Sequence, residues 1–197
     1  MTPPLVCIDP GHGGTDPGAV SGGVRESDVA LAHALAIGAA LQAAGVAVLY
    51  TRAEDASRTL ASRARAANDA GARLFVSVHA NASESPHPRG FQVFHCRGSQ
   101  RGAELARRIY DAALPATGET DWSGVYPDES AACGYRPLYV LRATRMPAVL
   151  IELGFVTHPG ERARLQDPAY RQLLAASVAS GILADLGLPA QCVPASS

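Results

Sequence analysis

Short apolar runs alternate with longer amphipathic segments along this chain. The runs are rich in Val, Ile, Leu and Phe, and they predict strands at 5–9, 46–51, 73–79, 90–96, 138–141 and 148–153. Helical spacing and capping residues predict helices at 27–44, 57–70, 100–114, 160–165 and 169–186. Ser27 or Asp28 is expected to cap the first of these helices, and Ser57 or Thr59 the second. Strands that alternate with helices indicate an α/β fold, in which helices cover both faces of a sheet.

Length and composition fit one domain. The chain has 197 residues, 47% of them hydrophobic, and we assign 1–188 to a single domain and 189–197 to a frayed C-terminal tail. No apolar run approaches the roughly 20 residues that cross a bilayer, so we expect no membrane insertion. The formal charge of -1, from 17 basic and 18 acidic residues, gives no reason to expect nucleic-acid binding.

Cysteine usage argues against a cysteine-ligated metal. The chain has 4 cysteines, at positions 7, 96, 133 and 192, and none forms a CxxC motif. Cys7 lies in an apolar run and is expected to be a free buried thiol. A disulfide between Cys96 and Cys133 stays open at this stage.

Four polar residues stand at the ends of apolar runs or in the glycine-rich loop after one. They are His12, Glu26, His79 and Glu152. Ligands of α/β sheets gather where strands end and loops begin. Two imidazoles and a carboxylate are a common Zn²⁺ ligand set that leaves a position open for water, and zinc lowers the pKa of that water toward about 7. A glutamate in an apolar strand end has a raised pKa, so Glu152 is the candidate proton shuttle for amide hydrolysis.

Each of these residues also has a structural interpretation when it is taken alone. A single His after a strand usually has a structural role, Glu26 fits a charge at a helix start, and Glu152 fits a buried partner of Arg142. His95 ends a predicted strand and could line the site. The remaining histidines, at 33, 87 and 158, are expected to be structural or on the surface.

Together, these strings resemble the zinc-dependent N-acetylmuramoyl-L-alanine amidases of the amidase type 3 family. The resemblance runs from about Leu5 to Leu186, and its motifs occur in the family's order at 8–18, 26–28, 76–81, 139–142 and 146–155. It implies a twisted, mostly parallel sheet of about six strands, with 1–188 as the catalytic domain. It also implies one Zn²⁺ per chain, held by His12, Glu26 and His79, with Glu152 as the catalytic acid and base.

The resemblance further implies the reaction and the partner. The substrate would be peptidoglycan, cleaved at the amide between the lactyl group of N-acetylmuramic acid and L-alanine of the stem peptide. Asn81, Asp9 and Arg142 match family strings and are assigned to substrate contacts or to positions that support the metal ligands, with Asn81 and Arg142 as the substrate-binding candidates. Asn is common in the family where His158 stands, a change that should matter little.

Two departures bear on regulation and specificity. Some family members carry a long insert over the zinc that an activator must displace, and 94–100 leaves no room for it, so no obligatory protein activator is expected. The segment 122–137 is irregular, and its aromatic residues Trp122, Tyr126 and Tyr135 are candidates for stacking on sugar or peptide.

Two other functions compete with the amidase. A carboxypeptidase-like zinc peptidase would use Arg142 or Arg145 to hold a terminal carboxylate, and a non-catalytic peptidoglycan-binding domain would carry a vestigial site. The start of the chain has no signal-peptide features, so we expect either a cytoplasmically made endolysin or a mature or excised catalytic domain that acts on the cell wall.

Overall fold

The computed structural model describes residues 2–118 and 120–189, so most of the expected tail at 189–197 lies outside the described residues. The strands are β1 (Leu5–Pro10), β2 (Val20–Ser21), β3 (Val24–Arg25), β4 (Ala47–Tyr50), β5 (Leu74–Asn81), β6 (Gln92–His95), β7 (Gly124–Pro127) and β8 (Ala148–Phe155). The helices are α1 (Glu26–Ala43), α2 (Leu60–Asp69), α3 (Gln100–Thr117), α4 (Tyr139–Ala143), α5 (Pro159–Gln166) and α6 (Pro168–Leu186), with a 3-10 turn at Ala131–Cys133.

Six strands form the main sheet, in the order β4-β1-β5-β8-β6-β7. Strands β4, β1, β5 and β8 run parallel, β6 pairs antiparallel with β8, and β7 pairs parallel with β6. The short strands β2 and β3 form a separate hairpin. The predicted single α/β domain with a mostly parallel sheet of about six strands is therefore confirmed.

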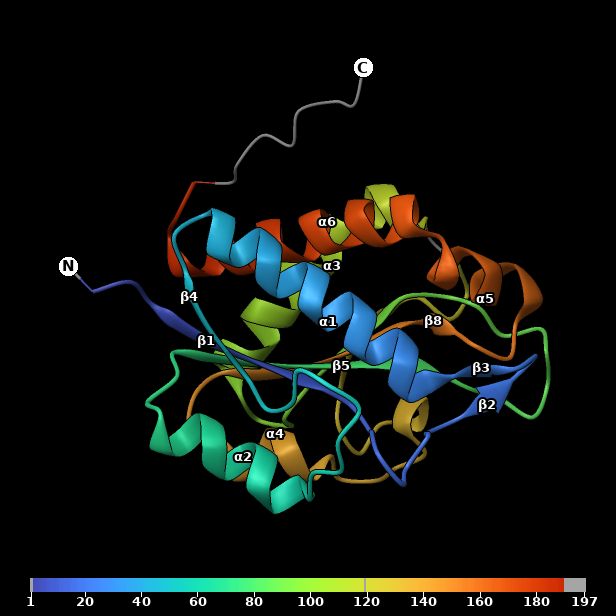
Figure 1. Ribbon diagram of the computed structural model, residues 1–197, viewed down its shortest axis with the longest axis horizontal. Helices are drawn as coiled ribbons and strands as arrows, with labels where there is room; N and C mark the ends of the chain where they lie inside the picture. Colours follow the sequence, from blue (N-terminus) through green and yellow to red (C-terminus); the bar gives the residue numbers. More distant parts are fainter. Residues whose placement is uncertain (1, 119, 190–197) are drawn as a thin grey trace.

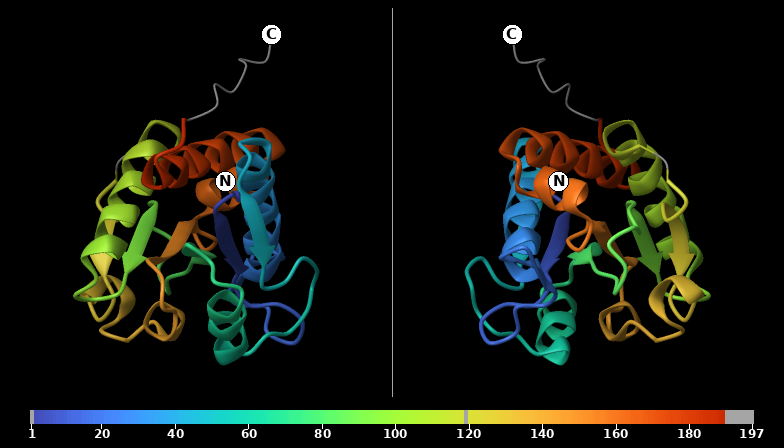
Figure 2. Two further views of the ribbon diagram at one scale, coloured as in Figure 1. Left: turned by 90° about the vertical axis from the view of Figure 1, so that its left-hand side faces the viewer. Right: turned by 90° about the vertical axis from the view of Figure 1, so that its right-hand side faces the viewer.

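Helices cover both faces of this sheet (Figures 1 and 2). Helices α1, α3 and α6 lie on one face, and α2 and α4 lie on the other. Alternate residues of one strand point to opposite faces, so Val6 and Ile8 of β1 join the larger core under α1, α3 and α6, whereas Cys7 joins the smaller core under α2 and α4.

The smaller core becomes polar toward the ends of the parallel strands. In β5, Phe75 is apolar, but Ser77 and His79 follow at the same two-residue spacing. In β8, Leu150 is followed in the same way by Glu152. The sheet face that α2 and α4 cover is therefore apolar along most of β5 and β8 and polar at the carboxyl ends of these strands, the polar edge of the sheet.

Two expectations about elements were wrong. The run Leu138–Leu141 was expected to be a strand, but it enters α4, which packs against α2 through buried Val140 and Leu141. A four-residue apolar run does not distinguish a strand from a short helix. The sixth strand of the sheet is instead β7, inside a segment that we expected to be irregular, and its residues are only partly buried.

The start of α1 also differs from the expectation. The predicted cap was Ser27 or Asp28, but the helix begins at Glu26 after Arg25, which makes no side-chain capping bond. The prediction for α2 is confirmed, because Thr59 caps that helix by accepting a hydrogen bond from the Ser62 N–H at 3.1 Å.

The structure also shows the state of the described cysteines and the character of the helices. In the described part of the chain, Cys7, Cys96 and Cys133 are free thiols, so the disulfide left open above does not form. Cys7 is buried, as predicted, and burial raises its pKa to about 12. No helix among the described residues has both the length and the apolar character needed to cross a bilayer.

Candidate metal centre and active site

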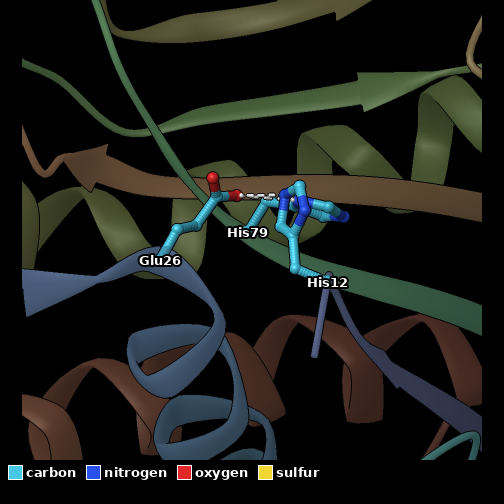
Figure 3. A group of neighbouring side chains, drawn as sticks. All are labelled: His12, Glu26 and His79. Atoms are coloured by element: carbon cyan, nitrogen blue, oxygen red, sulfur yellow. Dashed lines mark hydrogen bonds and ion pairs between the residues drawn. The ribbon is translucent and has the colours of Figure 1, made fainter. Parts of the chain in front are cut away.

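Three side chains that are distant in sequence meet at the polar edge of the sheet (Figure 3). His12 comes from the loop after β1, Glu26 from the first residue of α1, and His79 from β5. One ligand atom from each residue lies within 4.8 Å of the other two. Glu26 Oε1 is 3.0 Å from His12 Nε2 and 3.0 Å from His79 Nδ1, so these two ring nitrogens face the shared carboxylate.

The loop geometry directs His12 into this cluster. His12 has a φ of 56°, a left-handed backbone conformation that is uncommon for a residue with a side chain. Its Nδ1 lies 2.8 Å from the Asp16 carboxylate, which leaves Nε2 free to face Glu26. A carboxylate that holds the second nitrogen of a ligating histidine fixes the orientation of the ring.

Glu26 is held from two sides. Its Oε2 accepts a hydrogen bond from the Ala19 N–H at 3.0 Å, and its Oε1 accepts one from the Ala80 N–H at 3.3 Å. Burial alone would raise the pKa of Glu26, but hydrogen bonds and charge from His12 and His79 outweigh burial and lower it. The carboxylate is therefore ionised, the form that binds a metal cation.

Glu152 lies beside the cluster on the next strand. In the register of β5 and β8 it is paired with His79, and in the register of β6 and β8 it is paired with Gln92. Its Oε2 is buried and has no hydrogen-bond partner among the described residues. Burial raises the pKa of Glu152 well above its ordinary value, and the negative charge of Glu26 raises it further.

A cleft of about 510 Å³ opens next to the two histidines. Its inner wall includes Asp9, Ser77 and His79, and its apolar side is formed by Leu138, Val140 and Leu150. Leu60 and Tyr139 at its rim are 56% and 49% exposed, so the apolar rim faces solvent.

The remaining expected site residues have defined places. Asn81 donates from Nδ2 to Gln92 Oε1 at 2.8 Å. Gln92 is the residue that lies opposite Glu152 in the register of β6 and β8. Arg142 does not pair with Glu152. It binds the buried Asp128 at 2.7 Å and Glu129 at 2.9 Å.

The other histidines lie outside the cluster. The expectation for His95 was wrong about location, because β6 runs antiparallel to β8 and pairs His95 with Val149, three residues back from Glu152. His33 is buried within α1, and His158 accepts the Glu161 N–H as the cap of α5, so both are structural. Sequence reasoning missed Gln92, since its position depends on the direction of β6.

An α/β sheet that gathers two imidazoles and a carboxylate beside a second buried carboxylate is typical of metal-dependent hydrolases. The sequence profile of the N-acetylmuramoyl-L-alanine amidase family, amidase type 3, matches residues 6–184, and the chain belongs to this family.

A curated relative agrees with this assignment. The chain is 32% identical over 178 residues to the N-acetylmuramoyl-L-alanine amidase LytC of Bacillus subtilis, a match that covers 89% of this chain and 34% of LytC. It therefore spans about a third of the length of that relative.

Two solved structures share the fold. The catalytic domain of CwlV, an N-acetylmuramoyl-L-alanine amidase from Bacillus (Paenibacillus) polymyxa var. colistinus, superposes with a TM-score of 0.84 at 32% identity, covering 94% of this chain and 99% of that one. The CwlD amidase from Clostridioides difficile, solved in complex with the GerS lipoprotein, gives a TM-score of 0.84 at 29% identity and covers 93% and 98%.

Proposed function

We propose that this domain is a zinc-dependent N-acetylmuramoyl-L-alanine amidase. Its reaction would hydrolyse the amide between the lactyl group of N-acetylmuramic acid and L-alanine of the peptidoglycan stem peptide. The observation that carries the proposal is the convergence of His12, Glu26 and His79 beside the unpaired carboxylate oxygen of Glu152.

The donor set fits Zn²⁺. Imidazole nitrogen and carboxylate oxygen bind zinc at about 2.0–2.2 Å, and catalytic sites use three protein ligands. The ligand atoms of His12, Glu26 and His79 are already within 4.8 Å of one another, and Asp16 orients the first of them. When bound, zinc would act as a Lewis acid on the scissile carbonyl and would make water more acidic.

Glu152 would move the proton. Its raised pKa makes the carboxylate a stronger base, which would accept a proton from the attacking water and deliver that proton to the leaving nitrogen of L-alanine. Oε2 is the atom available for this transfer, because it has no hydrogen-bond partner within the described part of the chain. The neighbouring negative charge of Glu26 favours the protonated form of Glu152, so the proton taken from water would stay on Glu152 until the leaving nitrogen accepts it.

The cleft beside the histidines is the proposed binding site of the substrate. It combines the polar edge of the sheet with the exposed apolar rim of Leu60 and Tyr139, a mixture that suits a ligand with both peptide and sugar parts. Contacts of Asn81 and Arg142 with the substrate remain predictions. Arg142 already shares its guanidinium with Asp128 and Glu129, so any contact it makes would extend an existing ion-pair cluster.

The decisive experiment is mass spectrometry of digested peptidoglycan. The parent protein should release glycan free of peptide and create new L-alanine amino termini, and a strong chelator should abolish both products. Release of single amino acids would instead support the carboxypeptidase-like function, and a protein that binds sacculi without cleaving them would support a binding domain.

The role of Glu152 has its own test. Glu152→Gln removes the proton carrier but keeps the shape, so kcat should fall by about 10²- to 10⁴-fold, while zinc still binds. Glu104→Gln is the matched control, because Glu104 lies on α3 and pairs with the neighbouring Gln100 and Arg101. A Glu152→Gln enzyme that retains the parental kcat would remove Glu152 from the mechanism.

We also propose that the domain acts at the cell wall and needs no obligatory protein activator. Only four residues separate the end of β6 at His95 from the start of α3 at Gln100, so no inserted helix covers the cleft from this connection. The isolated domain should therefore digest purified sacculi unaided. Activity that requires an added protein would contradict this proposal.

A further inference from the structure

Four consecutive carbonyl groups, from the last residue of β1 into the His12 loop, accept hydrogen bonds from side chains that lie about 40 to 50 residues further along the chain. The carbonyl oxygens of Pro10, Gly11 and His12 accept hydrogen bonds from arginine guanidinium groups, and that of Gly13 accepts one from the Ser57 hydroxyl at 3.3 Å. The two arginines involved, Arg52 and Arg63, are each only 3% exposed. They contact segments that carry the expected metal ligands, but neither belongs to the cluster of His12, Glu26 and His79.

Arg52 connects the His12 loop to the start of α1. Its Nε donates to the Pro10 carbonyl at 3.0 Å, and its Nη2 donates to the Gly11 carbonyl at 2.6 Å and to the Ser27 carbonyl at 2.9 Å. Ser27 directly follows Glu26, so one guanidinium group spans the two segments that carry the first and second ligands.

Arg63 connects the same loop to β5. Its Nη2 donates to the His12 carbonyl at 2.6 Å, and its Nη1 binds the buried Asp9 carboxylate at 2.8 Å. Asp9 also accepts the Ser77 hydroxyl at 2.7 Å, and Ser77 lies two residues before His79 on the same face of the strand. Arg63 therefore links the segments that carry His12 and His79.

A guanidinium group is well suited to binding several backbone carbonyl groups at once. It presents five N–H donors in a fixed plane, whereas an ammonium group offers a compact point charge. A backbone in the left-handed region, as at His12, persists only where surrounding contacts hold it there. Buried charges are costly unless they are paired and hydrogen-bonded. Arg63 is paired with Asp9, and Arg52 donates hydrogen bonds to the carbonyl groups of Pro10, Gly11 and Ser27.

We propose that Arg52 and Arg63 are positioning residues that assemble the three ligand segments before the metal binds. They would hold the His12 backbone in its left-handed conformation and set the distances to Glu26 and His79. The consequence is a site in which zinc binding does not have to order the loop, so zinc affinity depends on two side chains that do not touch the ion. This inference rests on the proposed zinc site.

The test measures Zn²⁺ binding to the metal-free protein by competition with a chelator of known affinity. Arg63→Lys keeps the charge but loses the planar donors, and it should weaken zinc affinity by about 10- to 100-fold, the range typical for residues that support metal ligands. Arg65→Lys on the same helix is the matched control, because Arg65 is exposed, and it should bind zinc like the parent. Thermal unfolding of each metal-free variant is recorded alongside.

The outcomes separate positioning from general stability. Weaker zinc binding by Arg63→Lys at a temperature where the protein is fully folded supports the inference. Parental zinc affinity with a lowered unfolding temperature would overturn it, because the arginine would then only stabilise the fold. A parent protein that binds no zinc would instead defeat the proposed function.

A milder variant keeps the test valid if Arg63→Lys does not fold. Ser57 is exposed and holds the same loop from its outer side: its hydroxyl donates to the Gly13 carbonyl and accepts from the Thr15 N–H at 3.0 Å. Ser57→Ala should reduce zinc affinity by about 2- to 10-fold, as expected for the loss of one or two hydrogen bonds that order the site. Parental affinity in this variant would count against a preassembled loop.

Discussion

Protonation of His33 should destabilise the fold between pH 6.5 and about 4. His33 lies in α1 with its side chain 0% exposed, and its Nε2 donates to the Leu165 carbonyl at 3.1 Å. Its Nδ1 is buried without a partner among the described residues. Burial lowers the pKa of His33 from 6.5 to about 4; the Leu165 hydrogen bond opposes this shift, and the charge of Arg171 adds to it.

The sign and size of the effect follow from proton linkage. Between pH 6.5 and about 4 the unfolded chain protonates this imidazole and the folded chain does not, so the unfolded state gains stability as pH falls. A shift of one pKa unit corresponds to about 1.4 kcal/mol. His33 should therefore remove about 2–3 kcal/mol from the free energy of unfolding between pH 7.5 and pH 4.5. Below pH 4 its contribution stops changing.

The assay compares urea unfolding of the metal-free parent and His33→Gln at pH 7.5 and pH 4.5. Glutamine can keep a donor toward the Leu165 carbonyl but does not titrate, so the variant should lose about 2–3 kcal/mol less than the parent over this interval. His87→Gln is the control, because His87 is an exposed loop residue and should follow the parent. Equal losses in the parent and His33→Gln would refute the reasoning.

Two close approaches of glycine give further predictions. A Cβ on Gly181 would lie 2.6 Å from the Ile109 Cα where α6 crosses α3, so Gly181→Ala should cost about 1–3 kcal/mol of stability in thermal unfolding, with Ser180→Ala as control. A smaller loss would mean that the helices separate easily. A Cβ on Gly11 would overlap the His79 imidazole, so Gly11→Ala should displace that ligand and weaken zinc binding by about 10-fold or more in chelator competition. Parental affinity would show that the ring has room to move.

Local pattern was enough to find most of the sheet and the chemical residues. The strands at the start of the chain, around His79 and before Glu152 are buried apolar runs that end at polar residues, and this pattern is visible in sequence. The resemblance to the amidases rests on the same strings, because the candidate site residues stand in them. These predictions succeeded where a short segment carries its own signal.

The failures come from what a local pattern does not encode. The run at 138–141 was assigned wrongly because a short apolar segment indicates burial but does not distinguish a strand from a helix, and β7 was missed because its residues are only partly buried and form no clear apolar pattern. His95 was expected near the site because it ends a strand, but the direction of β6 places Gln92 there instead. Strand direction is set by chain connections across the whole sheet, which periodicity does not record.

The sequence by itself determined which residue types were available for metal chemistry and which segments were apolar enough to form the sheet. Only the tertiary structure decided that Glu152 lies opposite His79 in the strand register, that Arg142 forms an ion pair with Asp128, and that Arg52 and Arg63 donate hydrogen bonds to the His12 loop. The physical reason is that an apolar pattern encodes burial within one segment, whereas a hydrogen bond or an ion pair needs two atoms brought together from distant segments by the packing of the whole domain.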